Sequence, residues 1–189
     1  MQGFSGVLSV RMPPLDSRIF WGIRHLFYKV ITGRLTGVGY IGRPIFFIGR
    51  RRFYAGNGLG LFPGARIEIT DGTLEFGDNV RIGHNLFISC ASSLTVGSNV
   101  TMSAGVFIST TENKVQNDKL TPFSKWPIFE MPVDIGDNCF IGYGAAILPG
   151  TRLGKGCIVG ANAVVRGEHP DGTIIAPAKS EPIGIRSWT

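Results

Sequence analysis

The sequence predicts an all-β fold, a parallel β-helix of six-residue repeats with a short N-terminal α-helical arm and a protruding loop. Three observations predict it. Aliphatic residues recur every six positions over much of the chain, and Gly, Asn and Asp follow them at the expected corners. Two stretches break this repeat: a basic segment before residue 54, and a polar segment at residues 110–132. We therefore expect an arm and lead-in over 1–53 and a β-helix domain over 54–186, with an inserted loop.

The repeat is clearest in five consecutive units, which read IGDNCF, IGYGAA, ILPGTR, LGKGCI and VGANAV from Ile135 onward. A looser run begins at Phe76 with FGDNVR and IGHNLF. Gly and Asn tolerate positive φ at a corner, and the small fifth residue of each unit fits inside it. Three such sides close one coil, so Cys139 would stack against Cys157 of the next coil. Each coil buries its aliphatic residues only against its neighbours, as in a solenoid. A sandwich would show longer alternating runs.

The N-terminal arm carries the positive charge of the chain. Residues 1–53 contain nine Lys and Arg against the single acid Asp16, whereas residues 54–189 contain ten against twelve acids. A helix is predicted from Asp16 or Ser17 to Gly33, with an apolar face at helical spacing that comprises Ile19, Phe20, Ile23, Leu26, Phe27 and Val30. We expect this face to pack on the β-helix or a neighbouring protomer, or to lie on an anionic membrane. His25 is expected at the polar boundary of the helix.

The segment IGDNCFIGYGAAILPGTRLGKGCIVGANAVV resembles the hexapeptide-repeat acyltransferases. Within that family the chain is most similar to sugar O-acetyltransferases of bacterial surface-polysaccharide clusters, and to maltose and galactoside acetyltransferases. The resemblance covers roughly residues 40–186. It implies a left-handed parallel β-helix, acetyl-CoA as co-substrate, and a homotrimer with active sites between neighbouring protomers.

The resemblance also implies where the cofactor binds, along a groove near the Gly-x-Gly corners of the last coils. Small residues there would let the thioester approach the backbone closely. Arg166 and Lys179 are candidates for the phosphate groups of CoA. The full set of expected cofactor-binding residues is Gly142, Tyr143, Ala145, Gly160, Ala161, Arg166 and Lys179. The alternative for the two basic residues is an ordinary solvated side chain.

The chain departs from the family at the catalytic base. Related enzymes use a histidine just before the long loop, and Thr111 and Asn113 occupy that region here. Glu112 is the nearest ionisable group and is a candidate base, although an ordinary exposed loop acid is the competing interpretation. His84 is the remaining candidate, at a corner where a surface role is favoured. The catalytic candidates are thus Glu112, Asn113 and His84.

The inserted loop would cap the acceptor end of the cofactor groove and reach toward a neighbouring protomer. Trp126 and Phe123 would present flat apolar surfaces to a sugar ring, and Lys114, Asn117 and Lys125 could hydrogen-bond its hydroxyls. The expected substrate-binding residues are Ser89, Thr111 and Trp126.

Other classes of function are disfavoured. His25, His84 and His169 are too scattered to form a three-histidine zinc site, so no metal is expected. The main body is slightly acidic and carries no nucleic-acid-binding motif, so no nucleic-acid partner is expected. Three cysteines without a CxxC pair favour a reducing compartment, and neither a membrane span nor a signal peptide is recognisable. We expect a cytoplasmic protein, with a peripheral position on the inner membrane face as the alternative.

These observations favour an acetyl-CoA-dependent O-acetyltransferase that acts on a sugar of a surface polysaccharide or its lipid-linked precursor. Two alternatives stay open. One is a catalytically silent hexapeptide-repeat scaffold, because the usual histidine is missing. The other is an N-acetyltransferase on an amino sugar, because an unprotonated amine needs less help from a base.

Overall fold

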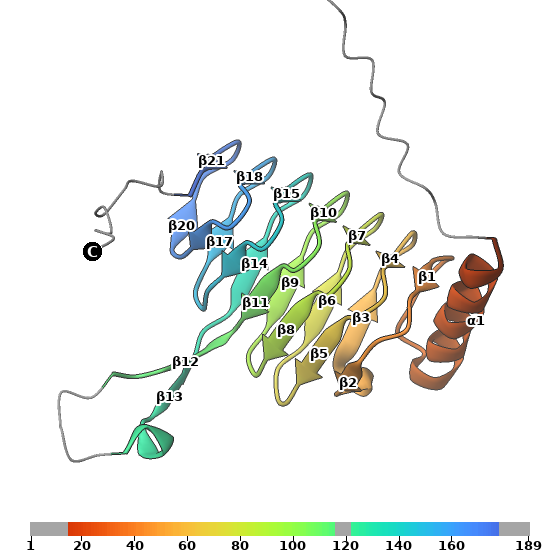
Figure 1. Ribbon diagram of the computed structural model, residues 1–189, viewed down its shortest axis with the longest axis horizontal. Coiled ribbons are helices and arrows are strands. Elements are labelled where there is room, and N and C mark those ends of the chain that lie inside the picture. Colours follow the sequence, from red (N-terminus) through yellow and green to blue (C-terminus); the bar gives the residue numbers. More distant parts are fainter. Residues whose placement is uncertain (1–14, 116–121, 178–189) are drawn as a thin grey trace, which may run out of the picture.

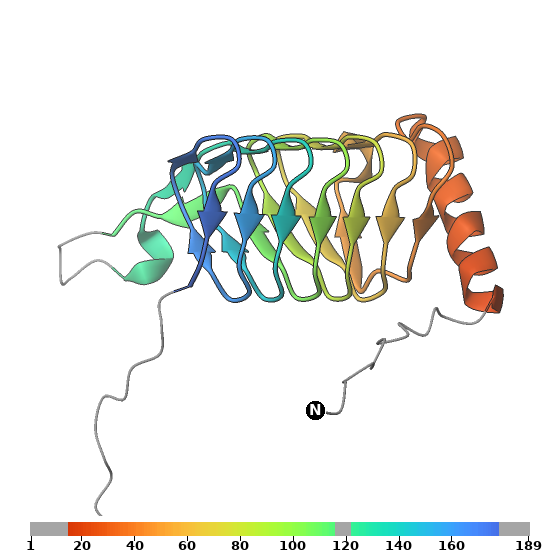
Figure 2. The same ribbon diagram turned by 90° about the horizontal axis from the view of Figure 1, so that it is seen from above.

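The computed structural model describes residues 15–115 and 122–177. It confirms the predicted β-helix. Three sheets of parallel strands extend along one axis, and α1 lies across the N-terminal end (Figures 1 and 2). Strands that are neighbours in a sheet are one coil apart in the sequence, so the chain visits three sheets, which we call B, C and A, in turn. The long axis of the molecule is therefore built by repetition of one short coil.

Within each sheet, every strand hydrogen bonds to the next one along the axis. Sheet B contains β1 (Tyr40–Ile41), β4 (Gly60–Leu61), β7 (Arg81–Ile82), β10 (Thr101–Met102), β15 (Phe140–Ile141), β18 (Ile158–Val159) and β21 (Ile174–Ile175). Sheet C contains β2 (Phe46–Ile48), β5 (Arg66–Ile69), β8 (Phe87–Cys90), β11 (Phe107–Ser109), β16 (Ala146–Ile147) and β19 (Val164–Val165). Sheet A contains β3 (Phe53–Ala55), β6 (Leu74–Phe76), β9 (Leu94–Val96), β14 (Val133–Ile135), β17 (Arg152–Leu153) and β20 (Glu168–His169).

The corners confirm the predicted role of asparagine. Five of them place an asparagine at a φ between 56° and 59°, a left-handed conformation that asparagine adopts more readily than most residues: Asn79, Asn85, Asn99, Asn138 and Asn162. Each follows a Gly-x dipeptide in the sequence. The Asn79 side-chain amide also donates a hydrogen bond to the Asn99 side chain at 3.2 Å, so equivalent corners of successive coils are linked.

The interior is filled by the residues that the repeat assigns to it. The first residue of each unit points inward and is buried, as for Ile141, Ile147 and Val159, each with no exposed surface. The small fifth residue is also buried in every clear unit: Cys139, Ala145, Thr151, Cys157 and Ala163. Cys139 and Cys157 precede paired residues of β15 and β18, which confirms that they stack. Burial of this apolar row is the main stabilising term of such a fold.

The arm forms helix α1 (Leu15–Thr32), which packs against the first coil but not with the predicted face. The buried face consists of His25 and Tyr28, with Trp21 half-buried beside them. Trp21 contacts the rings of Tyr40 and Phe62, with ring centroids 5.9 Å and 5.7 Å away. The expected docking of the helix on the β-helix is thus confirmed, but the Ile19–Val30 face does not make the contact, because bulky aromatic residues on the other face fill the open end of the coil. A neighbouring protomer and an anionic membrane stay predictions for the Ile19–Val30 face.

The aliphatic face of α1 is exposed to solvent instead. Its side chains are between 55% and 76% exposed: Ile19, Phe20, Ile23, Leu26, Phe27, Val30 and Ile31. The predicted position of His25 is also wrong, since its side chain is only 2% exposed and its two ring nitrogens have no hydrogen-bond partner among the described residues. His25 lies against Gly39, where a Cβ atom would approach the imidazole ring to 3.0 Å.

The inserted loop forms a hairpin that projects from the body at the end of β11 (Figure 1). It consists of β12 (Thr111–Asn113), β13 (Ile128–Glu130) and the 3₁₀ turn η2 (Phe123–Lys125), and we call these elements the hairpin arm. The two strands pair antiparallel, with Thr111 opposite Glu130 and Asn113 opposite Ile128. The projection of the loop agrees with the sequence, whereas its pairing into a hairpin is a new finding.

The division of the chain at residue 53 stays a prediction. Strands β1 and β2, with the 3₁₀ turn η1 (Arg50–Arg52), already belong to the first coil, so the β-helix strands begin within the lead-in. Across residues 15–115 and 122–177, no helix combines the length and apolar character needed to span a bilayer.

Candidate functional site

Two of the three corners of the coil contain the predicted site residues. The loop corner joins sheet C to sheet A and comprises residues 49–52, 70–73, 91–93, 110–132, 148–151 and 166–167. The glycine corner joins sheet B to sheet C and comprises residues 42–45, 62–65, 83–86, 103–106, 142–145 and 160–163. Sheet C lies between them. Five of the predicted cofactor residues lie at the glycine corner, whereas Arg166 lies at the loop corner with Thr111, Glu112 and Asn113.

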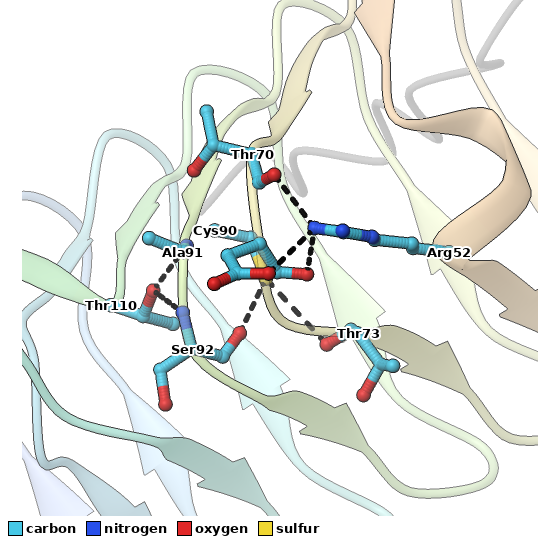
Figure 3. A network of polar contacts seen from close by, with 8 residues as sticks. Arg52, Thr70, Thr73, Cys90, Ala91, Ser92 and Thr110 are labelled. Carbon is cyan, nitrogen blue, oxygen red and sulfur yellow. Dashed lines mark hydrogen bonds and ion pairs between the residues drawn. The ribbon is translucent and has the colours of Figure 1, made fainter.

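Thr110 fixes the base of the hairpin arm at the loop corner (Figure 3). Its side chain is fully buried, and its hydroxyl oxygen accepts hydrogen bonds from the backbone N–H groups of Ala91 and Ser92, at 2.9 Å and 3.0 Å. The backbone carbonyl of Thr110 accepts a hydrogen bond from Met131 N–H at 2.9 Å, where the chain returns from the arm. Thr110 thus binds the loop-corner turn of the preceding coil through its hydroxyl. Its backbone also joins the two ends of the hairpin arm at the body.

Polar contacts at the loop corner continue into the coils that lie nearer the N-terminus. The Cys90 thiol donates to the Ser92 carbonyl at 2.9 Å, and burial raises the pKa of this thiol to about 11. One coil further, the Arg52 guanidinium donates to the Thr70 carbonyl at 2.6 Å and pairs with the Asp71 carboxylate at 3.0 Å (Figure 3). The loop corner is therefore held by polar contacts over several successive coils.

Glu112 and Arg166 meet in an ion pair at the loop corner. The Arg166 guanidinium donates a hydrogen bond to the Glu112 carboxylate at 2.6 Å, across 54 residues of sequence. Both side chains are about half exposed, at 43% for Glu112 and 47% for Arg166. The pair joins the first strand of the hairpin arm to the last loop-corner turn, so a predicted base and a predicted cofactor ligand lie side by side.

Two of the other acceptor candidates flank Glu112 on β12, and the third lies on the neighbouring part of sheet C. Thr111 is half-buried, and its backbone N–H donates to the Ser109 hydroxyl at 3.1 Å. Asn113 is exposed on β12. Ser89 is half-buried on β8, directly opposite Ser109 of β11. These hydroxyl and amide groups offer donors and acceptors of the kind that bind sugar hydroxyls.

The outer part of the hairpin arm is aromatic. Trp126 is half-buried and meets the ring of Phe123 edge to face, with ring centroids 4.7 Å apart. The Lys114 ammonium lies 5.4 Å from the centre of the Phe129 ring. Phe123 is 76% exposed, so the arm presents a large apolar surface away from the body. Asn117, another expected sugar contact, lies outside the described residues.

The glycine corner holds five of the predicted cofactor residues, and its glycines are also needed by the fold. A Cβ atom on Gly142 would lie 2.6 Å from the Ala161 nitrogen, and one on Gly160 would lie 3.1 Å from Pro177. Ala145 has no exposed surface, so neither its side chain nor its backbone is open to a ligand within one protomer. Tyr143, in contrast, is 61% exposed at this corner. Lys179, the remaining candidate, lies outside the described residues.

No histidine of the chain reaches Glu112 at the loop corner. His84 is exposed at the glycine corner, where its ring contacts Phe62 with centroids 5.1 Å apart. His25 is buried on the face of α1 that contacts the first coil, and the burial lowers its pKa, with a smaller contribution from the charge of Lys29. His169 pairs with Leu153 in the register of sheet A and contacts the Arg166 carbonyl at 3.1 Å. Within one protomer, the candidate base on the same strand as Thr111 and Asn113 is therefore the Glu112 carboxylate.

The sequence reasoning missed the outward row of sheet C, which runs along the β-helix axis next to the glycine corner. In register order it reads Phe46, Arg66, Phe87, Phe107, Ala146 and Val164. The Arg66 guanidinium lies 5.3 Å from the centre of the Phe87 ring, and Phe87 and Phe107 are 5.3 Å apart. The last residue of each six-residue unit could have indicated this row, since aromatic residues recur there. Nowhere in the described parts of the chain do three His, Cys, Asp or Glu side chains gather as a metal site would require.

Comparison with known proteins supports the resemblance in the repeat region. A family model described as the hexapeptide repeat of succinyl-transferase matches residues 75–110 and 132–166. The gap between the two matched stretches coincides with the hairpin arm. The arm is therefore an insertion into the repeat rather than a distorted part of it.

Two curated relatives are named as acetyltransferases. A Mycobacterium tuberculosis protein named as a probable acetyltransferase is 36% identical over 124 residues, which are 65% of this chain and 41% of the relative. The Escherichia coli protein WbbJ, named for O-acetyl transfer in lipopolysaccharide biosynthesis, is 36% identical over 117 residues, which are 57% of this chain and 59% of the relative. The chain thus spans about half the length of the curated relatives it matches.

A solved structure has the same fold. AntD, an N-acyltransferase from Bacillus cereus crystallised with dTDP and coenzyme A, superposes with a TM-score of 0.66 at 15% identity, covering 86% of this chain and 89% of AntD. At this identity the likeness concerns the fold alone.

Proposed function

We propose that the chain, whose repeat region matches the hexapeptide-repeat model, is an acetyl-CoA-dependent O-acetyltransferase of that family. The acceptor is a sugar of a bacterial surface polysaccharide or its lipid-linked precursor. The observation that carries this proposal is the hairpin arm, which interrupts the repeat at the loop corner, carries Thr111, Asn113 and Trp126, and holds Glu112 in an ion pair with Arg166. Relatives named as acetyltransferases support the class of reaction.

The reaction needs only an acceptor, a base and the thioester. The oxygen of a sugar hydroxyl attacks the thioester carbonyl, the carbon–sulfur bond breaks, and CoA leaves as a thiolate, which takes up the proton that the base removed from the hydroxyl. Glu112 accepts the hydroxyl proton, while Asn113 and Ser89 orient the acceptor and Thr111 and Trp126 hold the sugar ring. Arg166 has five N–H donors and pairs with Glu112 by one of them, so the others can bind a phosphate of CoA.

A second protomer completes the site in this proposal. The acceptor candidates lie at the loop corner, whereas Gly142, Tyr143 and Ala161 lie at the glycine corner across sheet C. In a homotrimer, the loop corner of one copy can face the glycine corner of the next, where His84 also lies. The exposed apolar residues of the hairpin arm and the aromatic row of sheet C supply surfaces for such contacts.

The proposed location is the cytoplasm, with a peripheral position on the inner membrane face. The three cysteines are free and buried, which suits a reducing compartment. Acetyl-CoA would be available there as co-substrate.

One alternative acceptor has a specific observation in its favour. The position expected for the catalytic histidine holds Thr111 and Asn113, and no histidine replaces it within the protomer. An amine that is already unprotonated needs less assistance than a hydroxyl, so an amino sugar is the second candidate.

The test is release of the CoA thiol from acetyl-CoA in the presence of sugar acceptors, with the product identified by mass spectrometry. An ester-linked acetyl group, which mild alkali removes, would support O-acetylation. An alkali-stable amide would favour the amino-sugar alternative. Absence of both products across nucleotide sugars, oligosaccharides and lipid-linked sugars, together with no binding of acetyl-CoA, would overturn the enzyme proposal in favour of a scaffold.

A further inference from the structure

Helix α1 leaves its aliphatic face uncovered at the N-terminal end of the β-helix. The helix lies across that end, and its His25–Tyr28 face is the one in contact with the coil (Figures 1 and 2). The opposite side chains are all at least 55% exposed, from Ile19 at 55% to Val30 at 76%. Val38 and Ile45, in the turns that follow, are 78% and 76% exposed. A soluble protein seldom exposes so much contiguous apolar surface without a partner for it.

A cationic pocket opens beside this face. It has a volume of about 500 Å³ and is lined by Ile31, Ile48 and Ile69 together with Arg50, Arg51 and Arg52. Ile31 belongs to the exposed face of α1, so the pocket and the helix face are continuous. The pocket thus combines apolar side chains with three guanidinium groups.

Two of these arginines have no acidic partner among residues 15–115 and 122–177. Arg52 pairs with Asp71, but Arg50 and Arg51 are exposed and form no ion pair in that part of the chain. The Arg50 guanidinium lies 5.9 Å from the centre of the Tyr28 ring, which directs it along the helix. Arg24 and Lys29 donate to the Ile41 and Gly37 carbonyls and add further positive charge to this end of the molecule.

We propose that this end of the molecule binds the surface of an anionic phospholipid bilayer, with the aliphatic face of α1 among the acyl chains and Arg50 and Arg51 on the headgroup phosphates. An amphipathic helix with apolar residues on one side and basic residues at its edges is the element that lies in a membrane interface. The arginine pocket would receive one phosphate, and its isoleucine side chains would contact the adjoining acyl chain.

Charge complementarity favours the bilayer over a second copy of this chain as the occupant. Residues 1–53 carry nine basic residues and one acid, so two copies meeting face to face would bring like charges together. Such a juxtaposition costs free energy, whereas anionic headgroups neutralise the same arginines.

The proposed orientation would bring the site close to the membrane, a consequence that rests on the proposed function. Three coils separate Arg50–Arg52 from Thr110 on the same corner, which is about 14 Å at the usual strand spacing. A sugar attached to a lipid diphosphate could span such a distance. The membrane-binding proposal itself stands without this link.

The experiment is flotation of the full-length protein with vesicles of pure phosphatidylcholine or of phosphatidylcholine containing phosphatidylglycerol. Wild-type protein should float with the anionic vesicles and remain behind with the neutral ones. Binding should weaken as salt rises, since screening removes the attraction between exposed charges. Arg50→Ala and Arg51→Ala should each lower the partition coefficient about fivefold.

Matched variants test whether binding depends on this surface or on any loss of an exposed apolar or basic side chain. Ile23→Gln on the exposed face of α1 should abolish most of the binding, whereas Ile174→Gln, exposed at the far end of the β-helix, should leave it unchanged. Arg81→Ala on sheet B is the control for loss of one exposed arginine. Far-ultraviolet circular dichroism checks that each variant folds.

Three outcomes would overturn the proposal. Wild-type protein could fail to float with anionic vesicles at low salt. Only a protein that lacks residues 1–14 could float with the vesicles, which would make that segment the native cover of the helix. Ile23→Gln could instead lower the oligomer mass in light scattering with no change in flotation, which would make a second copy the occupant. Acetyl transfer to a soluble acceptor, measured on the same variants, distinguishes loss of membrane binding from failure of the proposed function.

Discussion

The Arg166 guanidinium donates a hydrogen bond to the Glu112 carboxylate at 2.6 Å, and this pair joins the hairpin arm to the last loop-corner turn. Both groups are about half exposed, so the pair adds little to stability, about 1 kcal/mol or less. The position of Glu112 between Thr111 and Asn113 on β12 instead suggests a role in the reaction.

Replacement of Glu112 tests that role. In Glu112→Gln, turnover with the sugar acceptor should fall by about 10²- to 10⁴-fold, the usual contribution of a general base, while the melting temperature stays nearly constant. Steady-state kinetics measures the turnover. Glu130→Gln, an exposed acid on the facing strand of the hairpin arm, is the matched control. Full activity in Glu112→Gln would remove this residue from the mechanism, and His84→Ala should then be tested as the next candidate.

Acetyl-CoA should stabilise the protein against heat through the glycine corner. A ligand at a hundred times its dissociation constant adds about 2.7 kcal/mol by mass action, which a thermal shift assay detects readily. Tyr143→Ser removes the exposed aromatic ring at that corner and should reduce the shift. Lys179→Ala should also reduce it if this lysine binds phosphate. Phe140→Ser, on the neighbouring sheet B surface, is the control, and an equal loss there would argue against a local effect.

Thr110→Val should destabilise the protein. The substitution keeps the shape of the side chain but removes the acceptor for two backbone N–H groups, those of Ala91 and Ser92. Leaving such buried donors unpaired costs about 1–3 kcal/mol each. Urea denaturation measures the change in the free energy of unfolding. Thr110→Ser keeps the hydroxyl and should retain most of the stability, so equal losses in both variants would show that packing, not hydrogen bonding, is decisive.

The free energy of unfolding should fall in mildly acidic solution because His25 is buried where α1 contacts the first coil. Burial lowers the pKa of His25 below its ordinary value of 6.5, so the unfolded chain binds the proton more readily than the native one. The free energy of unfolding should therefore decrease as the pH falls below 6.5, and level off below the native pKa. Melting temperatures across this range measure the effect. His25→Phe should flatten the dependence of the melting temperature on pH. His84→Phe, at an exposed site, should leave that dependence unchanged.

The proposed trimer predicts a particle of three times 20.4 kDa in light scattering. Ile128→Glu places a charge on the exposed apolar surface of the hairpin arm, and Val164→Glu does so on the outward row of sheet C. Each should shift the mass toward the monomer, because a buried unpaired charge is costly. Thr95→Glu on the exposed face of sheet A should remain trimeric. A monomeric wild-type protein that still transfers acetyl groups would refute the shared site.

The β-helix was predictable because its interactions are local. Each six-residue unit specifies its own inward aliphatic residue and corner, and a coil needs only its neighbours to bury them. The repeat therefore located the buried residues such as Ile141 and Cys157 and the left-handed corner asparagines such as Asn138. The interruption at residues 110–132 was visible for the same reason, since a break in a regular pattern needs no knowledge of distant contacts.

The tertiary structure alone decided which face of α1 packs, and which side chains meet at the loop corner. Apolar spacing indicated the Ile19–Val30 face, but His25 and Tyr28 occupy the contact because their rings fit the open end of the first coil. The pairing of Glu112 with Arg166 depends on the path of the hairpin arm across 54 residues of sequence. The separation of the loop-corner candidates from the glycine-corner candidates, on opposite edges of sheet C, depends likewise on how the three sides of the coil close. Such relations arise from shape and from long-range chain closure, and no repeating unit of the sequence carries them.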